Sequence, residues 1–214
     1  MEILLIAGVA VVLLVALLSS AFSAEARTKR ALAAAPLESI GKVQEGAVVR
    51  VKGRVRPVAD MIEAPLTGRY CVHYVAIVEE RHRGKHSTHW SEVTREAKGV
   101  DFEVQDATGE ILVRSQGLQV AITLDQHTRS GSFDDATEAE QKFLARMNES
   151  STGLLGFNRT LRYTEGALEA GEEITVLGQA RYRDLPGGGR ALILGPTPDG
   201  SALATDDRDI VIGR

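Results

Sequence analysis

The chain has 214 residues, of which 43% are hydrophobic and 25% charged, and its formal net charge is −4. So mild a charge gives no general attraction to nucleic acid, and the length suits one domain of ordinary size beside any extra segment. A single cysteine excludes an internal disulfide, and also a cysteine-rich zinc fold such as a RING finger, which needs many Cys and His ligands.

Residues 3–24 carry no charged side chain, and this predicts a membrane-spanning helix. At ~1.5 Å rise per residue the stretch gives a helix of ~33 Å, enough to cross a hydrocarbon core of ~30 Å. A cleaved signal peptide is the alternative, because residues 21–24 offer small side chains for cleavage. We favour a retained anchor, since only Met1 and Glu2 precede the run and the run exceeds the ~7–15 apolar residues usual in signal peptides.

The charges that flank this run indicate its orientation. Arg27, Lys29 and Arg30 follow it, whereas Glu2 precedes it. Positive flanks tend to stay in the cytoplasm, so we expect a single-pass protein whose main domain is cytoplasmic. The composition of residues 25–35 favours helix, and a proline at position 36 would end it. The predicted organisation is a transmembrane anchor with a helical stem over residues 1–35 and a β domain over residues 36–214.

From residue 47 the pattern changes to an alternation of apolar and basic side chains, which predicts a half-buried strand. Residues two apart on a strand lie ~7 Å apart, so the basic side chains form a stripe ~20 Å long. This basic stripe consists of Arg50, Lys52, Arg54 and Arg56. It is the candidate binding face, for anionic lipid headgroups or an acidic protein partner. The alternative is a strand charged only to prevent edge pairing.

Residues 69–80 give the strongest strand prediction, because they are apolar on both faces in the middle of the stretch. A tight turn at residues 83–85 and a returning strand over 87–94 would complete a hairpin. The sequence Asp106–Gly109 is a good hairpin turn between two further strands.

Beyond this hairpin the sequence predicts one helix and several more strands. Residues 136–148 are predicted as a helix, because an aspartate can cap its start and apolar side chains recur every fourth position. Residues 128–135 are expected to form a polar loop, and the tail over 196–207 to be rich in turns. Further strands are predicted over 118–124, 160–168, 172–184, 190–195 and 209–212.

Many short strands, one helix and no alternation of strands with helices predict a mainly β fold, a small antiparallel OB-like barrel or sandwich with one short helix. An OB-like groove for nucleic acid would need stacking aromatics beside its basic groups, and aromatics make up only 5% of the chain. We therefore expect no nucleic-acid partner.

Three closely spaced histidines raise the question of a metal site: His82, His86 and His89. Their spacing would suit zinc on a helix. However, Gly84 and the flanking strand patterns argue against a helix there, and the neighbouring Arg and Lys side chains repel a cation. We expect a solvated basic hairpin tip and no metal site.

Cys71 and His73 lie two apart, and a cysteine beside a histidine can become a nucleophilic thiolate. A cysteine inside an apolar strand more often behaves as a small buried hydrophobe. A thiol enzyme centred on Cys71 stays open as an alternative. No phosphate loop, nucleophile elbow or HExxH motif is present, so we expect no catalytic residue and no cofactor.

Short pieces spread over roughly residues 40–180 resemble, in order, one known family: Ala64-Pro65-Leu66, Gly68, Cys71, Tyr74, Trp90, Phe102, Asp106, Gly109, Glu165, Gly171 and Val176-Leu177-Gly178. They are similar to the GIDE domain, or "beside a membrane" domain, of mitochondrial membrane-anchored RING ubiquitin ligases and their bacterial relatives. The resemblance implies that Cys71 packs in a β core. It also implies the label E3 ubiquitin ligase, but in that family ubiquitin transfer belongs to a RING finger, which one cysteine cannot build.

The function that we expect is therefore a membrane-anchored, non-catalytic protein-binding or scaffold module, placed at a bacterial inner membrane. The resemblance implies a domain in a compartment equivalent to the periplasm, whereas the flanking charges favour the cytoplasm, and we keep the charge argument. An exported OB-like carrier, similar to single-span haem chaperones, is a further alternative. Such carriers need a haem-attaching histidine on a C-terminal segment, and no histidine follows His127.

Overall fold

The computed structural model describes residues 26–84, 87–131, 134–151, 159–184, 188–198 and 200–212. The predicted anchor over residues 3–24 lies outside these ranges. Of the helices that the ranges contain, none combines the length and the apolar character needed to cross a membrane. Strands dominate the described residues, so the prediction of a mainly β fold is confirmed.

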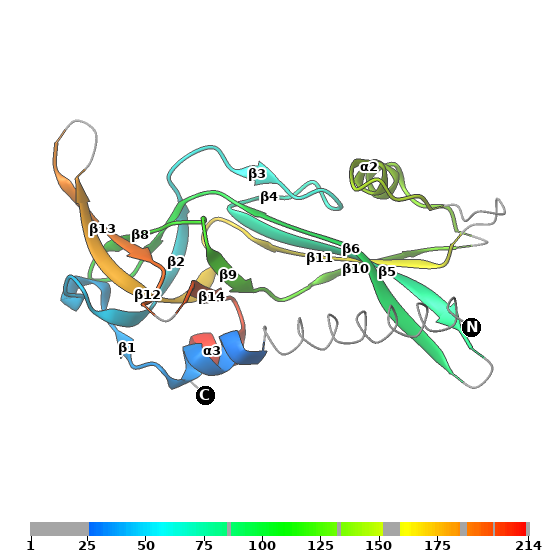
Figure 1. Ribbon diagram of the computed structural model, residues 1–214. Helices are drawn as coiled ribbons and strands as arrows, with labels where there is room; N and C mark the ends of the chain where they lie inside the picture. Colours follow the sequence, from blue (N-terminus) through cyan, green and yellow to red (C-terminus); the bar gives the residue numbers. More distant parts are fainter. Residues whose placement is uncertain are drawn as a thin grey trace, which may run out of the picture.

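An eight-stranded sheet forms one end of the molecule (Figure 1). Its members are β1 (Leu37–Glu38), β2 (Val48–Pro57), β7 (Phe102–Gln105), β8 (Glu110–Val113), β9 (Leu118–Ala121), β12 (Glu173–Asp184), β13 (Arg190–Gly195) and β14 (Ala202–Thr205). β2 pairs antiparallel with both β7 and β12. From β7 the ladder continues through β8 and β13 back to β12, so these five strands close into a ring. β13 and β8 are parallel and the other pairs of the ring antiparallel.

The alternation in β2 explains why this strand belongs to the ring. Val49, Val51 and Val55 are buried, and their side chains join the core that the other strands of the ring supply. The one interruption is Gly53, where a Cβ atom would lie 2.4 Å from the carbonyl oxygen of Gln105. Glycine therefore allows the backbones of β2 and β7 to approach closely.

A four-stranded antiparallel sheet extends away from the ring, in the order β10-β11-β5-β6 (Figure 1). Its strands are β5 (His73–Arg83), β6 (Thr88–Gly99), β10 (Gln126–Ser130) and β11 (Leu161–Leu168). The helix α2 (Glu138–Arg146) covers one face, where Phe143 and Leu144 pack in a core with Tyr74 and Tyr163. A capping box between Thr137 and Glu140 starts the helix inside its predicted range. A short pair, β3 (Ile62–Glu63) and β4 (Tyr70–Cys71), leads into β5.

Helical segments from the two ends of the described chain lie side by side. The first covers residues 26–34 and ends two residues before Pro36, where proline predicts an end. The second is α3 (Arg208–Ile212). An ion pair of 2.9 Å joins Lys29 to Asp207, and Leu32 is fully buried. A 3-10 turn, η1 (Ile40–Lys42), follows the first segment.

Three local predictions were wrong. Part of the expected loop at residues 128–135 belongs to β10, because polar residues there pair with β11. The turn-rich tail contains β14, which lies between β12 and β9. Residues 209–212 lie in the helix α3 and not in a strand. In each case pairing or packing with a distant segment overrides the local pattern.

Candidate functional site

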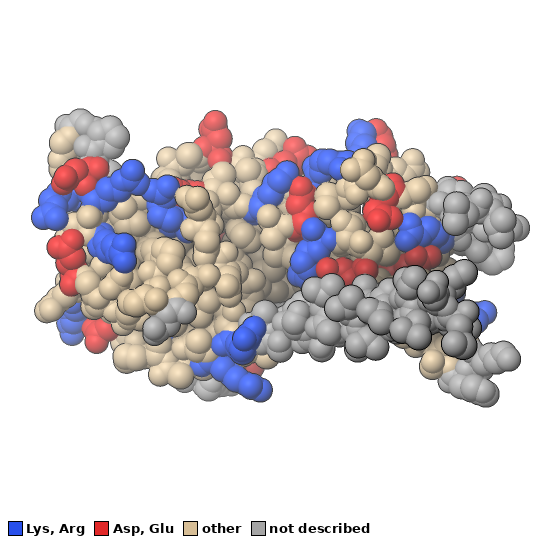
Figure 2. Space-filling model, in the orientation of Figure 1, with Lys and Arg blue, Asp and Glu red and all other residues tan. Residues whose placement is uncertain are grey.

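The basic stripe lies on the outer side of β2, opposite the buried valines. Arg54 and Arg56 are exposed, whereas Arg50 and Lys52 are half-buried. All four cations have acceptors within the protein, and these acceptors come from distant parts of the chain. The stripe is therefore not a row of free charges. On the face shown in Figure 2, basic and acidic side chains are likewise intermixed.

Arg50 is bound to the helical segment 26–34, whereas Arg54 and Arg56 face the solvent. Its Nη1 donates to the carbonyl oxygen of Leu32 at 2.6 Å and to that of Ala33 at 3.4 Å. These are carbonyls of the last helical turn, where a cation also complements the helix dipole. Arg50 therefore holds the helix against the ring.

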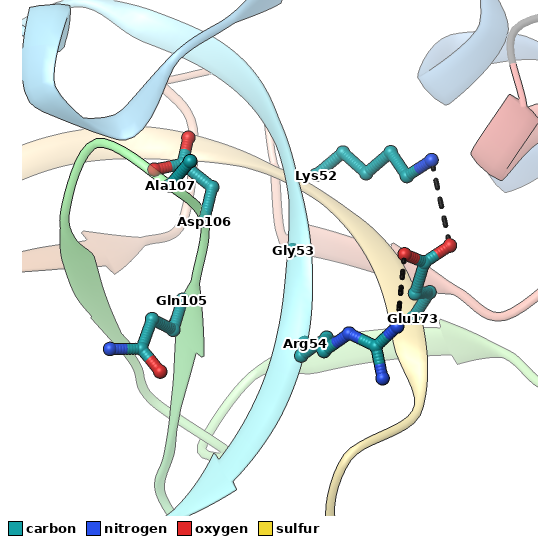
Figure 3. Close-up of a pocket in the computed structure, with 7 residues that line it drawn as sticks. All are labelled: Lys52, Gly53, Arg54, Gln105, Asp106, Ala107 and Glu173. Atoms are coloured by element: carbon teal, nitrogen blue, oxygen red, sulfur yellow. Dashed lines mark ion pairs between the residues drawn. The ribbon is translucent and has the colours of Figure 1, made fainter.

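Lys52 and Arg54 share one carboxylate, that of Glu173 on β12 (Figure 3). The nitrogen–oxygen distances are 3.6 Å from Lys52 and 3.8 Å from Arg54, and Arg54 also donates to the carbonyl oxygen of Gly171 at 3.4 Å. Arg56 lies 3.4 Å from Glu110. Because these groups are partly exposed, the pairs are screened by water and each adds little stability.

Next to these pairs is an open pocket of about 440 Å³ between β2, β12 and the turn after β7 (Figure 3). Its lining consists of Lys52, Gly53, Arg54, Gln105, Asp106, Ala107 and Glu173. Asp106 turns its carboxylate away from the two cations, toward the segment that contains η1. The pocket therefore offers two cations and one carboxylate, which suits a polar, charged ligand or a partner side chain.

Asp106 has a structural role. Its Oδ1 accepts hydrogen bonds from the backbone of Thr108 and of Gly109, which fixes the predicted hairpin turn, and its Oδ2 accepts from the N–H of Ile40 at 2.9 Å. Burial acts to raise the pKa of this carboxyl group, but the hydrogen bonds outweigh it and the pKa is lowered. Both carboxylate oxygens of Asp106 are therefore used by hydrogen bonds within the fold.

The structure does not make Cys71 and His73 a nucleophilic pair. Cys71 is fully buried, and its Sγ donates to the carbonyl oxygen of Ile62 at 3.5 Å. Burial, assisted by the charge of Glu165, raises the pKa of the thiol to about 11. Burial also lowers the pKa of His73 to about 4, and its Nδ1 has no hydrogen-bond partner among the described residues. Both groups are therefore neutral near pH 7, which argues against a thiolate.

The histidines of the hairpin do not converge on one point in the part of the chain that can be described. His82 and His89 face each other across β5 and β6, with ring centroids 5.4 Å apart. His82 Nε2 lies 2.8 Å from the hydroxyl of Ser91. His86 lies outside the described residues. Within those residues no group of three His, Cys, Asp or Glu side chains could hold a metal ion.

Glu165, one of the residues behind the family resemblance, is a fully buried carboxylate at the centre of β11. It accepts hydrogen bonds from the backbone N–H of Leu66 at 2.8 Å and from the hydroxyl of Thr67. It thus holds the Ala-Pro-Leu-Thr-Gly turn, in which Gly68 has a φ of 71°. In the described structure Glu165 therefore ties β11 to the turn that precedes β4.

An aromatic and basic cluster on the four-stranded sheet was not predicted from the sequence. The guanidinium of Arg162 lies 4.6 Å from the centroid of the Trp90 ring, and that of Arg129 lies 5.7 Å from it. Arg129 belongs to β10, a segment expected to begin a loop, so its neighbourhood could not be inferred. The only available signal was the position of the single tryptophan in the basic hairpin.

A family model described as GIDE, E3 ubiquitin ligase, matches residues 75–186, just over half of the chain. The match runs from β5 to the end of β12 and includes Trp90, Asp106 and Glu165, but the basic stripe lies before it. Neither the curated proteins nor the solved structures contain a significant match.

Proposed function

Because the chain belongs to the GIDE family, we propose that it is a membrane-anchored protein-binding module that transfers no ubiquitin itself. The observation that carries this proposal is the environment of Cys71, the only cysteine. A thiol that is fully buried, with a pKa raised to about 11, is unsuited to carry a covalent intermediate. One cysteine also cannot supply the ligands of a RING finger. Both facts support a binding role.

The proposed anchor is the uncharged stretch over residues 3–24, with the β domain on the cytoplasmic side of a bacterial inner membrane. The attachment of residues 26–34 to the body supports it. Arg50 binds the carbonyls of this helical segment, and Lys29 pairs with Asp207. A span joined directly to a helix held in this way would keep the body close to the bilayer.

The proposed partner site is the part of the basic stripe that remains exposed. Arg50 is used by the helix and Lys52 is half-buried beside Glu173, so Arg54 and Arg56 are the accessible cations. Their side chains are 69% and 56% exposed. The pocket beside them gives an acidic segment of a partner protein a place to dock. In binding, the partner would compete with Glu173 and Glu110 for these cations.

Cross-linking in native membranes, followed by purification of the tagged full-length chain, tests this function. The double variant Arg54→Glu, Arg56→Glu should lose a partner that the unchanged chain recovers. The matched control is Arg181→Glu, Arg183→Glu, which makes the same charge change on exposed residues of β12 and should keep the partner. Equal recovery with both variants would refute this site. Release of the chain by an alkaline wash would refute the anchor, and ubiquitin transfer by the purified chain would refute the binding role.

An OB-like carrier is the second candidate, and the closed ring β2-β7-β8-β13-β12 favours it, because OB domains are five-stranded barrels that bind ligands on their surface. The pocket lined by Lys52, Arg54 and Glu173 would then hold a small charged ligand. A small anion that raises the melting temperature of the unchanged chain, but not of Arg54→Glu, would support a carrier. If no small anion changes the melting temperature, the pocket is not the ligand site of a carrier.

A further inference from the structure

The far end of the four-stranded sheet carries cations and an aromatic ring that the proposed partner site does not use. β5 and β6 extend beyond β10 and β11 and project from the end opposite the β12–β13 hairpin (Figure 1). We define the hairpin surface by five residues: Arg81, Arg83, Trp90, Arg129 and Arg162. Trp90 is the only tryptophan of the chain.

These side chains lie on one side of the sheet. Arg81 stands directly opposite Trp90 in the pairing of β5 with β6, and directly opposite residues share a face. Arg83 lies two residues further along β5, so it points to the same side. From the other half of the sheet, Arg129 and Arg162 stand opposite each other and both approach the Trp90 ring.

The charges of this surface are not balanced within the described protein. Arg162 is paired with Glu79, with 2.6 Å between nitrogen and oxygen. The other nearby carboxylates are engaged too, Glu80 with Arg159 and Glu92 with Arg95.

Three arginines of the surface are left over: Arg81, Arg83 and Arg129. All three are exposed, and none has an ion pair with any residue that the structure describes. The hairpin surface therefore has an excess of positive charge around a half-buried indole.

We propose that the hairpin surface binds anionic phospholipid headgroups, as a second contact with the membrane. Guanidinium groups bind phosphate oxygens with two hydrogen bonds each, and arginines near an anionic bilayer are attracted by its surface potential. Tryptophan is enriched at the level of the headgroups, since its ring is apolar and its N–H is polar. The inference rests on the membrane location in the proposed function.

A lipid surface fits this cluster better than nucleic acid does. Single-stranded nucleic acid is bound by successive aromatic side chains on which the bases stack. Here Trp90 is the single tryptophan, and its ring is approached by the two guanidinium groups of Arg129 and Arg162. The phosphates of a lipid surface can be bound by separate cations together with one aromatic ring at the level of the headgroups.

The single tryptophan provides a direct test, because the intrinsic emission at its wavelength reports on Trp90 alone. The full-length chain is reconstituted into vesicles of phosphatidylcholine, with or without added phosphatidylglycerol. With anionic lipid we expect the emission of Trp90 to shift to shorter wavelength and to be quenched by brominated acyl chains. Both effects should disappear near 1 M salt, where the Debye length falls to about 3 Å.

The test variant is the double change Arg81→Glu, Arg83→Glu. These residues are exposed and have no ion pair within the described ranges, so folding should not change, and Arg129 and Arg162 remain beside the indole. In anionic vesicles the emission of the variant should match that of the unchanged chain in neutral vesicles. The control is again Arg181→Glu, Arg183→Glu, on the hairpin at the opposite end, which should keep the full shift.

The outcomes separate this inference from the proposed function. A chain that floats with both kinds of vesicle but shows the same emission in each keeps the anchor and overturns the lipid contact. A chain that floats with neither kind overturns both. Loss of the shift in the control would show that only net charge matters, which also overturns it. A larger change of Trp90 emission with a single-stranded oligonucleotide or polyglutamate than with anionic vesicles would also overturn the lipid contact.

Discussion

The ring of His73 lies against Gly99 so closely that a Cβ atom on the glycine would be 2.3 Å from Nδ1 of the imidazole. The two residues stand opposite each other on β5 and β6. We therefore expect Gly99→Ala to lower the free energy of unfolding by about 1–3 kcal/mol, the cost of overpacking a core. Urea unfolding in mild detergent measures it. Gly195→Ala is the control, since nothing lies within 4 Å of that position, and equal losses would contradict the prediction.

The buried imidazole should also make stability depend on pH. Burial lowers the pKa of His73 from 6.5 to about 4, so below pH 6.5 the unfolded chain takes up a proton that the folded chain refuses. Stability is therefore unaffected above pH 6.5 and lost as the pH falls toward 4, by up to about 3 kcal/mol. His73→Phe should weaken this loss of stability, because phenylalanine takes up no proton. The substitution breaks no hydrogen bond to Nδ1, which has no partner among the described residues. Unfolding midpoints of the unchanged chain and of His73→Phe at pH 7 and pH 4.5 measure this loss of stability. The same loss in the two proteins would contradict the prediction.

Removal of the buried carboxylate of Glu165 should release the turn that precedes β4. Glu165→Ala leaves the N–H of Leu66 and the hydroxyl of Thr67 without their acceptor. Both hydrogen bonds are only partly buried, and their loss should still loosen the turn, so faster proteolysis at residues 64–69 is expected. Glu165→Gln keeps one acceptor oxygen and should be cleaved at an intermediate rate. Unchanged cleavage in both variants would show that the turn is held by other contacts.

The thiol of Cys71 should react slowly in the folded protein. With a pKa of about 11, only about one molecule in a thousand carries a thiolate at pH 8, and the group is buried as well. Mass spectrometry after treatment with iodoacetamide should find little label in the native chain and complete label in urea. Rapid labelling of native Cys71 would reopen the thiol-enzyme alternative.

Loss of the Arg50 side chain should free the helical segment that it holds. Arg50→Ala removes the hydrogen bonds to Leu32 and Ala33, so amide exchange across residues 26–34 should become faster. Arg54→Ala is the matched control, since its ion pair involves Glu173 and not the helix. Hydrogen exchange followed by mass spectrometry measures both. Equal exchange in the two variants would assign the attachment to other contacts, such as the ion pair of Lys29 with Asp207.

Local patterns predicted the elements that local chemistry controls. The alternation in β2, the turn at Asp106 and the capped helix α2 all follow from neighbours in the sequence. The polar strand β10 could not be predicted, because it is a strand only through its pairing with β11. The same holds for β14, which lies between two strands within an otherwise turn-rich tail.

The candidate site could likewise be predicted only as far as local sequence patterns allow. The sequence placed the basic stripe on one face of a strand, and it lies on the outer side of β2. The groups that bind these cations could not be seen, because Glu173 and the carbonyl of Leu32 come from β12 and from the helical segment 26–34. The resemblance to the family similarly identified Glu165 but not its role in holding a distant turn.

The pairing of β2 with β12 has a consequence for synthesis. Residue 54 pairs with residue 173, so a nascent chain on the ribosome cannot close the ring until β12 and β13 have emerged. Until then β2 exposes an unpaired edge and its valines to the surrounding solution, a combination that favours aggregation. Contacts so distant in sequence also predict slow folding, since loop closure precedes any gain from packing. We therefore expect the nascent chain to need chaperones until β12 and β13 have been synthesised.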